Sequence, residues 1–164
     1  MKTTAYLSLG SNLGDREANL REAIAQLREL GSVTRISSFY ETEPVEVAGK
    51  QPWFLNCAAT VETELTPLEF LKRLLAIERS MGRKRTEPKG PRTIDMDIIF
   101  FGDEVLDTKD LSLPHPAMQH RRFVLEPLAE IASEVKHPVL QQTVRELLNS
   151  LPVDSGSVRR SRQN

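Results

Sequence analysis

Two aspartates, Asp95 and Asp97, alternate with apolar residues in a segment typical of a β-strand. Side chains of a strand alternate between its faces, so both carboxylates project from one face, about 6–7 Å apart, while Met96 and Ile98 take the other. Two such acids repel each other unless a cation or a basic group compensates their charge. Mg²⁺ prefers hard oxygen ligands and is commonly held by one or two carboxylates. The spacing predicts a magnesium site, although acids on the wet face of an edge strand would give the same pattern.

A basic segment lies directly before this acid pair. It holds one acid, Glu87, and six bases: Arg79, Arg83, Lys84, Arg85, Lys89 and Arg92. One arginine guanidinium can bind two phosphate oxygens at once. A polyphosphate bridged by Mg²⁺ needs both arginines and carboxylates around it. The combination predicts a site of phosphoryl transfer, whereas the basic segment alone would indicate only a solvated turn.

Phe54 and Asn56 alternate in a second strand-like segment, 54–63, and so share its more polar face. The opposite face, which carries Leu55 and Cys57, has the composition of a core. An aromatic ring beside a carboxamide can stack on a flat heterocycle and hydrogen-bond to it, although Phe54 alone would indicate only packing.

Two isolated groups are further candidates. His115 lies between two prolines and could contact a phosphate or a base, or be a surface histidine in a rigid turn. Glu78 falls on the apolar side of a predicted helix and needs a partner there.

The Gly10–Asp15 loop lacks the phosphate-loop and dinucleotide glycine patterns, and Asp15 is a better helix cap than a phosphate neighbour.

These residues must be positioned by alternating strands and helices. The periodicity predicts strands over 4–9, 33–40, 54–63 and 93–101, and helices over 15–30, from Thr66 onward, 126–132 and 143–149. The helix after Thr66 has a capping residue, Pro67 and Glu69 in the order typical of a helix start. We expect an α+β fold, a ferredoxin-like sandwich with an antiparallel sheet. A single domain over 1–152 and a flexible tail over 153–164 are predicted.

The composition excludes several classes of protein. The chain has 164 residues, 39% hydrophobic and 27% charged, which is typical of one folded domain. A single cysteine allows no internal disulfide, and no apolar run approaches the length of a membrane span. The net charge of −1 gives no overall attraction to nucleic acid or anionic lipid. We expect a cytoplasmic protein, a monomer, that binds neither nucleic acid nor membrane.

The chain resembles the 6-hydroxymethyl-7,8-dihydropterin pyrophosphokinase family. The resemblance rests on six blocks in the family's order, residues 6–12, 38–42, 51–56, 78–83, 90–97 and 114–116. The most specific block is Gly90-Pro91-Arg92-Thr93-Ile94-Asp95-Met96-Asp97. The family fold is ferredoxin-like, as expected above. Its members transfer pyrophosphate from ATP to the hydroxymethyl group of the dihydropterin in folate biosynthesis and release AMP.

The resemblance also implies roles for individual residues. Asp95 and Asp97 would hold two Mg²⁺ ions, and Arg83, Arg92 and Asp97 would be catalytic. The pterin would be bound by Thr42, Pro44, Val45, Phe54, Asn56 and Phe123. ATP, the co-substrate, would be bound by Glu78, Arg85, Ile98, Leu111, Ser112, His115 and Arg121.

Two other classes of function are weighed against this one. Another Mg²⁺-dependent nucleotidyl or phosphoryl transferase with the same acid pair would release pyrophosphate or ADP instead of AMP. A single-stranded RNA-binding module of the same fold would need a basic domain and an aromatic-rich strand, and the sequence has neither.

Overall fold

The computed structural model describes residues 1–44, 50–82, 92–153 and 156–161. Its centre is an antiparallel sheet in the order β5-β1-β4-β3-β8, with β2 paired to the far end of β4. The strands are β1 (Thr3–Ser11), β2 (Ser32–Ile36), β3 (Tyr40–Thr42), β4 (Phe54–Thr63), β5 (Asp95–Phe101) and β8 (Val158–Arg160). A separate short pair is formed by β6 (Leu106–Asp107) and β7 (Ser112–Leu113).

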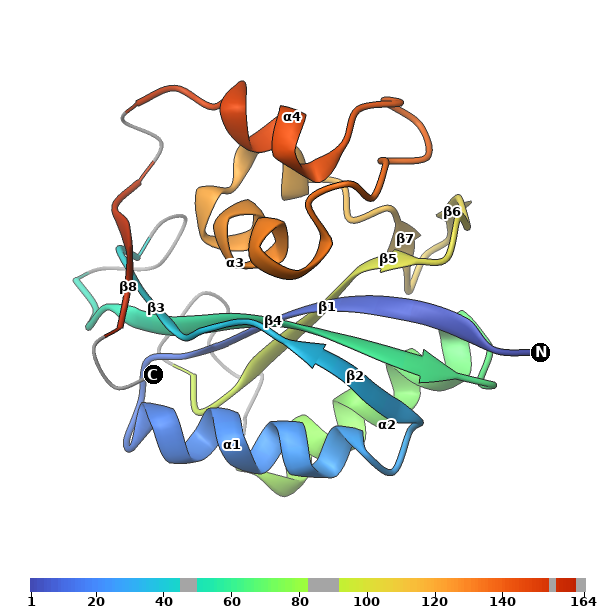
Figure 1. Ribbon diagram of the computed structural model, residues 1–164. Helices are drawn as coiled ribbons and strands as arrows, with labels where there is room; N and C mark the ends of the chain where they lie inside the picture. Colours follow the sequence, from blue (N-terminus) through green and yellow to red (C-terminus); the bar gives the residue numbers. More distant parts are fainter. Residues whose placement is uncertain (45–49, 83–91, 154–155, 162–164) are drawn as a thin grey trace.

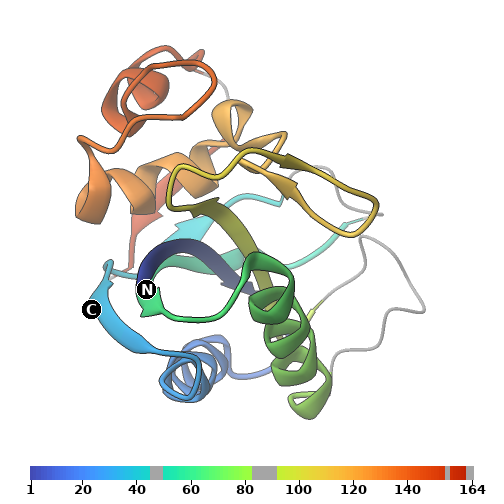
Figure 2. The same ribbon diagram turned by 90° about the vertical axis from the view of Figure 1, so that its right-hand side faces the viewer.

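Helices cover both faces of the sheet. One face carries α1 (Arg16–Leu27) and α2 (Pro67–Ser80), and the other carries α3 (Arg122–Ala132) and α4 (Val144–Asn149) (Figure 1). The turn of view in Figure 2 separates α1 from α2 and shows the β6–β7 pair beyond the end of β5. This mixed α+β sandwich with an antiparallel sheet confirms the predicted fold class.

The alternation of β4 and β5 divides their side chains as the sequence predicts. Leu55, Cys57, Met96 and Ile98 are buried in the core beneath α1 and α2. Ala58 belongs to a second core beneath α3 and α4. Burial raises the pKa of the Cys57 thiol to about 12, so this cysteine behaves as a small apolar side chain.

The predicted helix caps are present. The Asp15 side chain accepts a hydrogen bond from the N–H of Ala18 at 3.1 Å, which confirms its role as a cap. Thr66 and Glu69 form a reciprocal capping box ahead of α2, with Pro67 at the first helical position. These local signals place the starts of both helices that cover the first core.

Three segments differ from their predicted structure. The strand predicted over 33–40 is split into β2 and β3, because Ser37 turns its side chain to the N–H of Ala58 at 2.8 Å. Helix α3 begins at Arg122, four residues before the predicted start. Within the tail predicted to be flexible, β8 pairs with β3. The single domain over 1–152 stays a prediction.

Candidate functional site

The acid pair lies on β5 at the edge of the sheet, on the face that carries α3. Asp95 and Asp97 are partly exposed, while Met96 between them is buried. Arg92 Nη1 lies 3.2 Å from Asp95 Oδ2, so a guanidinium already compensates one of the two carboxylates. The chain thus presents hard oxygen atoms beside a basic group, the donor set that Mg²⁺ and a polyphosphate require.

Asn12 holds the chain around Arg92, a role that the sequence analysis missed. The Asn12 N–H donates to Arg92 O at 3.1 Å, and the Arg92 N–H donates to Asn12 Oδ1 at 2.8 Å. Asn12 Nδ2 donates to Gln51 Oε1 at 3.0 Å and to Pro52 O at 3.3 Å. The buried side chain therefore joins the segment before the acid pair to the segment before Phe54. A carboxamide at the end of a strand that enters a tight loop is the only sequence signal for it.

Glu78 supports the strand of the acid pair from behind. Its side chain is 2% exposed, and Oε2 accepts a hydrogen bond from the Met96 N–H at 2.8 Å. This provides the partner that its position on α2 required. Because Met96 separates the two aspartates, this bond holds the backbone that carries both of them.

The carboxamide of Asn56 is fixed on the same face of the sheet. Its Oδ1 accepts a hydrogen bond from Thr42 Oγ1, and its Nδ2 donates to Leu9 O at 3.1 Å. Asn56 is 4% exposed and Thr42 1%. An amide nitrogen has two hydrogens, and within the described residues Asn56 Nδ2 donates to Leu9 O alone, so its second N–H could serve a ligand.

Asn56, Gly10 and Asp95 form one row across three neighbouring strands. Gly10 of β1 is paired with Asn56 on one side and with Asp95 on the other. Two strand spacings place the Asn56 and Asp95 backbones about 10 Å apart. A Cβ on Gly10 would lie 2.5 Å from Asn56 Nδ2 and 3.3 Å from Phe54 Cδ1. A side chain at this position would therefore displace the Asn56 carboxamide.

A second aromatic ring comes from the start of α3. Phe123 lies in the first turn of this helix, partly exposed, and the Arg121 guanidinium is 5.6 Å from the centre of its ring. Arg121 ends the 3-10 turn Met118–His120 and is the residue before α3. Both side chains are thus presented by the same helix start.

His115 is tied to the middle of β5. Its N–H donates to Ile99 O at 3.0 Å, two residues beyond Asp97. Its Nδ1 accepts from the Ala117 N–H at 3.1 Å, so a neutral ring carries its proton on Nε2 and can donate it. This arrangement brings a proton donor to the strand of the acid pair.

The other predicted nucleotide residues differ in what they expose. Ser112 is partly exposed on β7, and its Oγ lies 3.5 Å from Asp107 Oδ1. Ile98 and Leu111 bury their side chains in the first core, so only their backbone groups are available to a ligand. Pro44 is partly exposed after β3, while Val45, Arg83 and Arg85 lie outside the described residues.

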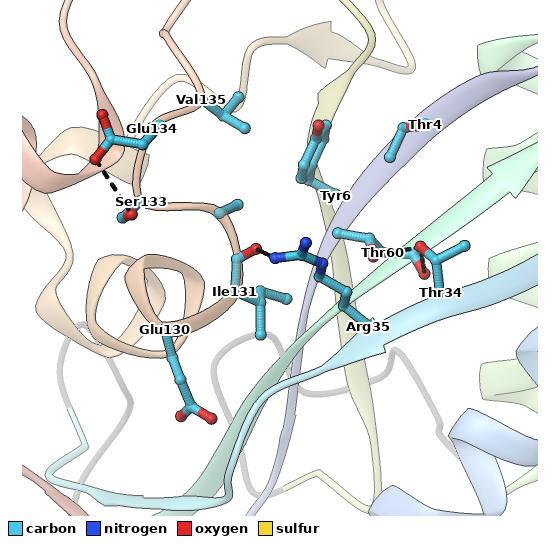
Figure 3. A pocket seen from close by; sticks show the side chains of 11 residues that line it. Thr4, Tyr6, Thr34, Arg35, Thr60, Glu130, Ile131, Ser133, Glu134 and Val135 are labelled. Atoms are coloured by element: carbon cyan, nitrogen blue, oxygen red, sulfur yellow. Dashed lines mark hydrogen bonds between the residues drawn. The ribbon is translucent and has the colours of Figure 1, made fainter.

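A separate pocket lies on the sheet face at the opposite end of α3, with a volume of about 460 Å³. Figure 3 shows Arg35 of β2 reaching across it to the end of the helix, where Nη1 donates to Ile131 O at 2.9 Å. Of the predicted site residues that the structure describes, none lines it. Arg35 therefore anchors the far end of α3, the helix whose first turn carries Phe123. Among the described residues, no helix is long and apolar enough to span a bilayer.

Solved structures resemble the whole fold. A Plasmodium falciparum HPPK-DHPS chain matches with a TM-score of 0.73 and 20% identity, over 91% of this chain and 43% of that one. A second HPPK-DHPS structure, in complex with substrates, matches with a TM-score of 0.72 and 19% identity, over 92% and 43%. At these identities the likeness defines the fold class, and the chain spans less than half the length of those proteins.

The sequence identifies the family. Residues 6–133 match the family described as 7,8-dihydro-6-hydroxymethylpterin-pyrophosphokinase. A Bacillus subtilis 2-amino-4-hydroxy-6-hydroxymethyldihydropteridine pyrophosphokinase is 47% identical, over 83% of this chain and 82% of its own length. The corresponding Aquifex aeolicus enzyme is 40% identical over 87% and 89%. The chain belongs to the 6-hydroxymethyl-7,8-dihydropterin pyrophosphokinase family.

This membership confirms the predicted family, enzyme class and pathway. The enzyme class is that of ATP-dependent pyrophosphokinases, which are transferases. The folic acid synthesis protein fol1 of Schizosaccharomyces pombe, 40% identical over 90% of this chain, names the pathway. This chain spans only 20% of that protein, so the match concerns one part of it.

Proposed function

We propose that this chain transfers the terminal two phosphates of ATP, as one pyrophosphoryl group, to the hydroxymethyl group of 6-hydroxymethyl-7,8-dihydropterin. The observation that carries the proposal is the row Asn56–Gly10–Asp95. It sets a carboxamide suited to a heterocycle about two strand spacings, roughly 10 Å, from a carboxylate suited to a metal. A dihydropterin bound at one end of the row would direct its hydroxymethyl group toward a triphosphate at the other.

The ATP side of the proposed site is built on β5 and the segments beside it. Asp95 and Asp97 are proposed to hold two Mg²⁺ ions, and Arg83 and Arg92 to contact the phosphates. The nucleotide is assigned to Glu78, Arg85, Ile98, Leu111, Ser112, His115 and Arg121. For Glu78 the contact with the Met96 N–H supports an indirect role, through the backbone of the acid pair.

The pterin side is assigned to Thr42, Pro44, Val45, Phe54, Asn56 and Phe123. Phe54 and Phe123 would stack on the two faces of the ring system. The Thr42 hydroxyl keeps the Asn56 carboxamide in one orientation, and its second N–H would donate to the edge of the pterin. Preorganised groups of this kind reduce the entropy lost when the substrate binds.

In the proposed reaction the substrate hydroxyl oxygen attacks the β-phosphorus and the bond from that phosphorus to the α–β bridging oxygen breaks. AMP leaves in line, and the hydroxyl proton is released to solvent. Magnesium, when bound, neutralises charge on the phosphate oxygens. Arg92 is proposed to stabilise charge on the same oxygens, and His115 to donate a hydrogen bond from its Nε2–H to a phosphate oxygen. Positioning and charge stabilisation account for the rate, because no protein nucleophile is needed.

The remaining assignments follow from this reaction. The partners are the two small-molecule substrates, with no nucleic acid or membrane. We assign the chain to the cytoplasm as a monomer, with one catalytic domain over 1–152.

The nucleotide product tests the proposal. The protein is mixed with MgATP and 6-hydroxymethyl-7,8-dihydropterin, and the nucleotides are separated by chromatography. AMP formed only when pterin and Mg²⁺ are both present is the expected result. ADP would overturn the reaction type and favour the alternative phosphoryl transferase, and the absence of any product would overturn the assignment to this chain.

A further inference from the structure

The last strand of the sheet, β8, lies against the segments that carry the proposed pterin residues. It pairs with β3 so that Val158 is opposite Thr42 and Arg159 opposite Glu41. Two bonds extend the ladder, from the Glu43 N–H to Ser157 O at 2.9 Å and from the Ser161 N–H to Phe39 O at 2.8 Å. Since β3 has only three residues, β8 doubles the number of strands that hold it in place.

The tail contacts both ends of the segment that joins β3 to β4, once through its backbone and once through a side chain. At its start, the Ser157 N–H donates to Glu43 Oε1 at 3.2 Å. At its end, the Arg159 guanidinium lies 5.3 Å from the centre of the Trp53 ring. Trp53 directly precedes Phe54, so Arg159 contacts the neighbour of a proposed stacking residue.

The tail also reaches α3. Arg160 Nη2 lies 3.4 Å from both Tyr40 Oη and Glu130 Oε1, and Tyr40 donates to Glu130 at 2.6 Å. Glu130 further accepts hydrogen bonds from the N–H and hydroxyl of Ser38. The tail, β3 and α3, whose first turn carries Phe123, are therefore joined through one carboxylate.

We propose that β8 is a positioning element of the pterin site, with Arg159 as its principal side chain. The strand holds Thr42, and the Arg159 guanidinium holds Trp53. Through these two residues β8 keeps Asn56 and Phe54 in the geometry that binds the pterin. This inference rests on the proposed function. Arg159 does not touch the substrate, and the ATP side on β5 is separated from β8 by β1, β4 and β3. Loss of β8 therefore affects one substrate and not the other.

Two variants of the full chain test this inference. Arg159→Ala removes the cation from Trp53, and deletion of residues 157–164 removes β8 itself. Arg28→Ala, at an exposed arginine after α1, is the matched control. Trp53 is the single tryptophan of the chain, so its fluorescence emission reports directly whether the tail contacts it.

Arg159→Ala should raise the KM for the pterin about fivefold, as expected from the loss of a cation–π contact, and the deletion should raise it further. The KM for ATP should stay within about twofold of the wild-type value, and Trp53 emission should change in both variants. Arg159→Lys, which keeps a cation over the ring, should recover part of the pterin affinity. Arg28→Ala should match the wild type in all three measurements.

Several results would overturn the inference. An altered Trp53 emission with an unchanged pterin KM would mean that the tail contacts the ring without positioning the site. An equal rise in the KM values of both substrates would indicate a general loss of structure. If the wild-type protein forms no AMP, the proposed function fails and the inference fails with it. Normal AMP formation with an unaffected Arg159→Ala variant rejects the inference alone.

Discussion

Asn12 and Arg92, 80 residues apart, exchange two hydrogen bonds, one between their backbones and one from the Arg92 N–H to the Asn12 side chain. The same side chain donates to Gln51 and Pro52, which precede the proposed stacking residue Phe54. The ATP side and the pterin side of the proposed site are thus joined by one buried carboxamide.

Asn12→Ala should lower kcat about tenfold or more, because the Arg92 N–H loses its partner and both segments are released. Steady-state kinetics with each substrate varied in turn measures this effect. Asn19→Ala is the matched control, since its side chain bonds Ser11 and Leu13 in the same loop without reaching Arg92. Equal kinetic losses in the two variants would contradict a specific role for Asn12.

Gly10→Ala should weaken pterin binding and spare ATP binding. The added Cβ would lie 2.5 Å from Asn56 Nδ2, so the carboxamide must move and its bond with Thr42 is disturbed. Pterin affinity should fall about tenfold in a binding titration. The same substitution in an Asn56→Ala background should add little, because the clash has been removed; full additivity of the two effects would rule out this mechanism.

Asp95→Asn and Asp97→Asn should each reduce turnover about a thousandfold, since an amide replaces a charged metal ligand at the same volume. The loss should appear in kcat at saturating MgATP, with circular dichroism and melting temperature close to wild type. Asp103→Asn, at an exposed acid on the turn after β5, should leave turnover unchanged. Normal turnover in either β5 variant would exclude that residue as a metal ligand.

Glu130 makes the stability of the fold depend on acid pH. Burial alone would raise the pKa of this carboxyl, but the hydrogen bonds from Tyr40 and Ser38 outweigh it, and the pKa is lowered. The carboxylate therefore stabilises the folded state above its unfolded pKa, and this stabilisation is lost as the pH falls through the lowered folded value. The contribution is present at neutral pH.

Urea unfolding of the wild type and of Glu130→Gln, from neutral to acid pH, measures this contribution to the free energy of unfolding. The difference in free energy of unfolding should be constant near neutral pH and shrink in acid. Glu134→Gln, at an exposed acid on the following turn, should track the wild type. A difference that persists unchanged at low pH would show that the Glu130 charge is not responsible.

The sequence predicted the parts of the fold that local patterns determine. The strand over 54–63 has its predicted bounds, and Asp95 and Asp97 share a face opposite Met96 because period-two alternation is a property of the strand itself. Asp15 and Thr66 cap the helices that follow them. Roles in binding came from the family resemblance, which the match over residues 6–133 supports.

Features that depend on distant partners were missed. β8 contains two arginines in three residues and no apolar alternation, and it becomes a strand only because β3 offers an open edge. The start of α3 was predicted too late because Pro127 lacks the N–H that a helix interior needs, which favours a helix that begins close to this proline. In the structure the helix begins earlier, at Arg122, because Val124 and Leu125 are buried in the second core. The double role of Asn12 arises from two segments that meet only in the folded chain.

In the proposed reaction both terminal phosphates of ATP move together to the pterin. Phosphorus NMR of the complete reaction mixture follows all of these phosphates at once. The ATP signals should be replaced by AMP and by the two coupled resonances of an unsymmetrical pterin diphosphate. The appearance of ADP with a pterin monophosphate, or of free pyrophosphate with a pterin–AMP adduct, would contradict it.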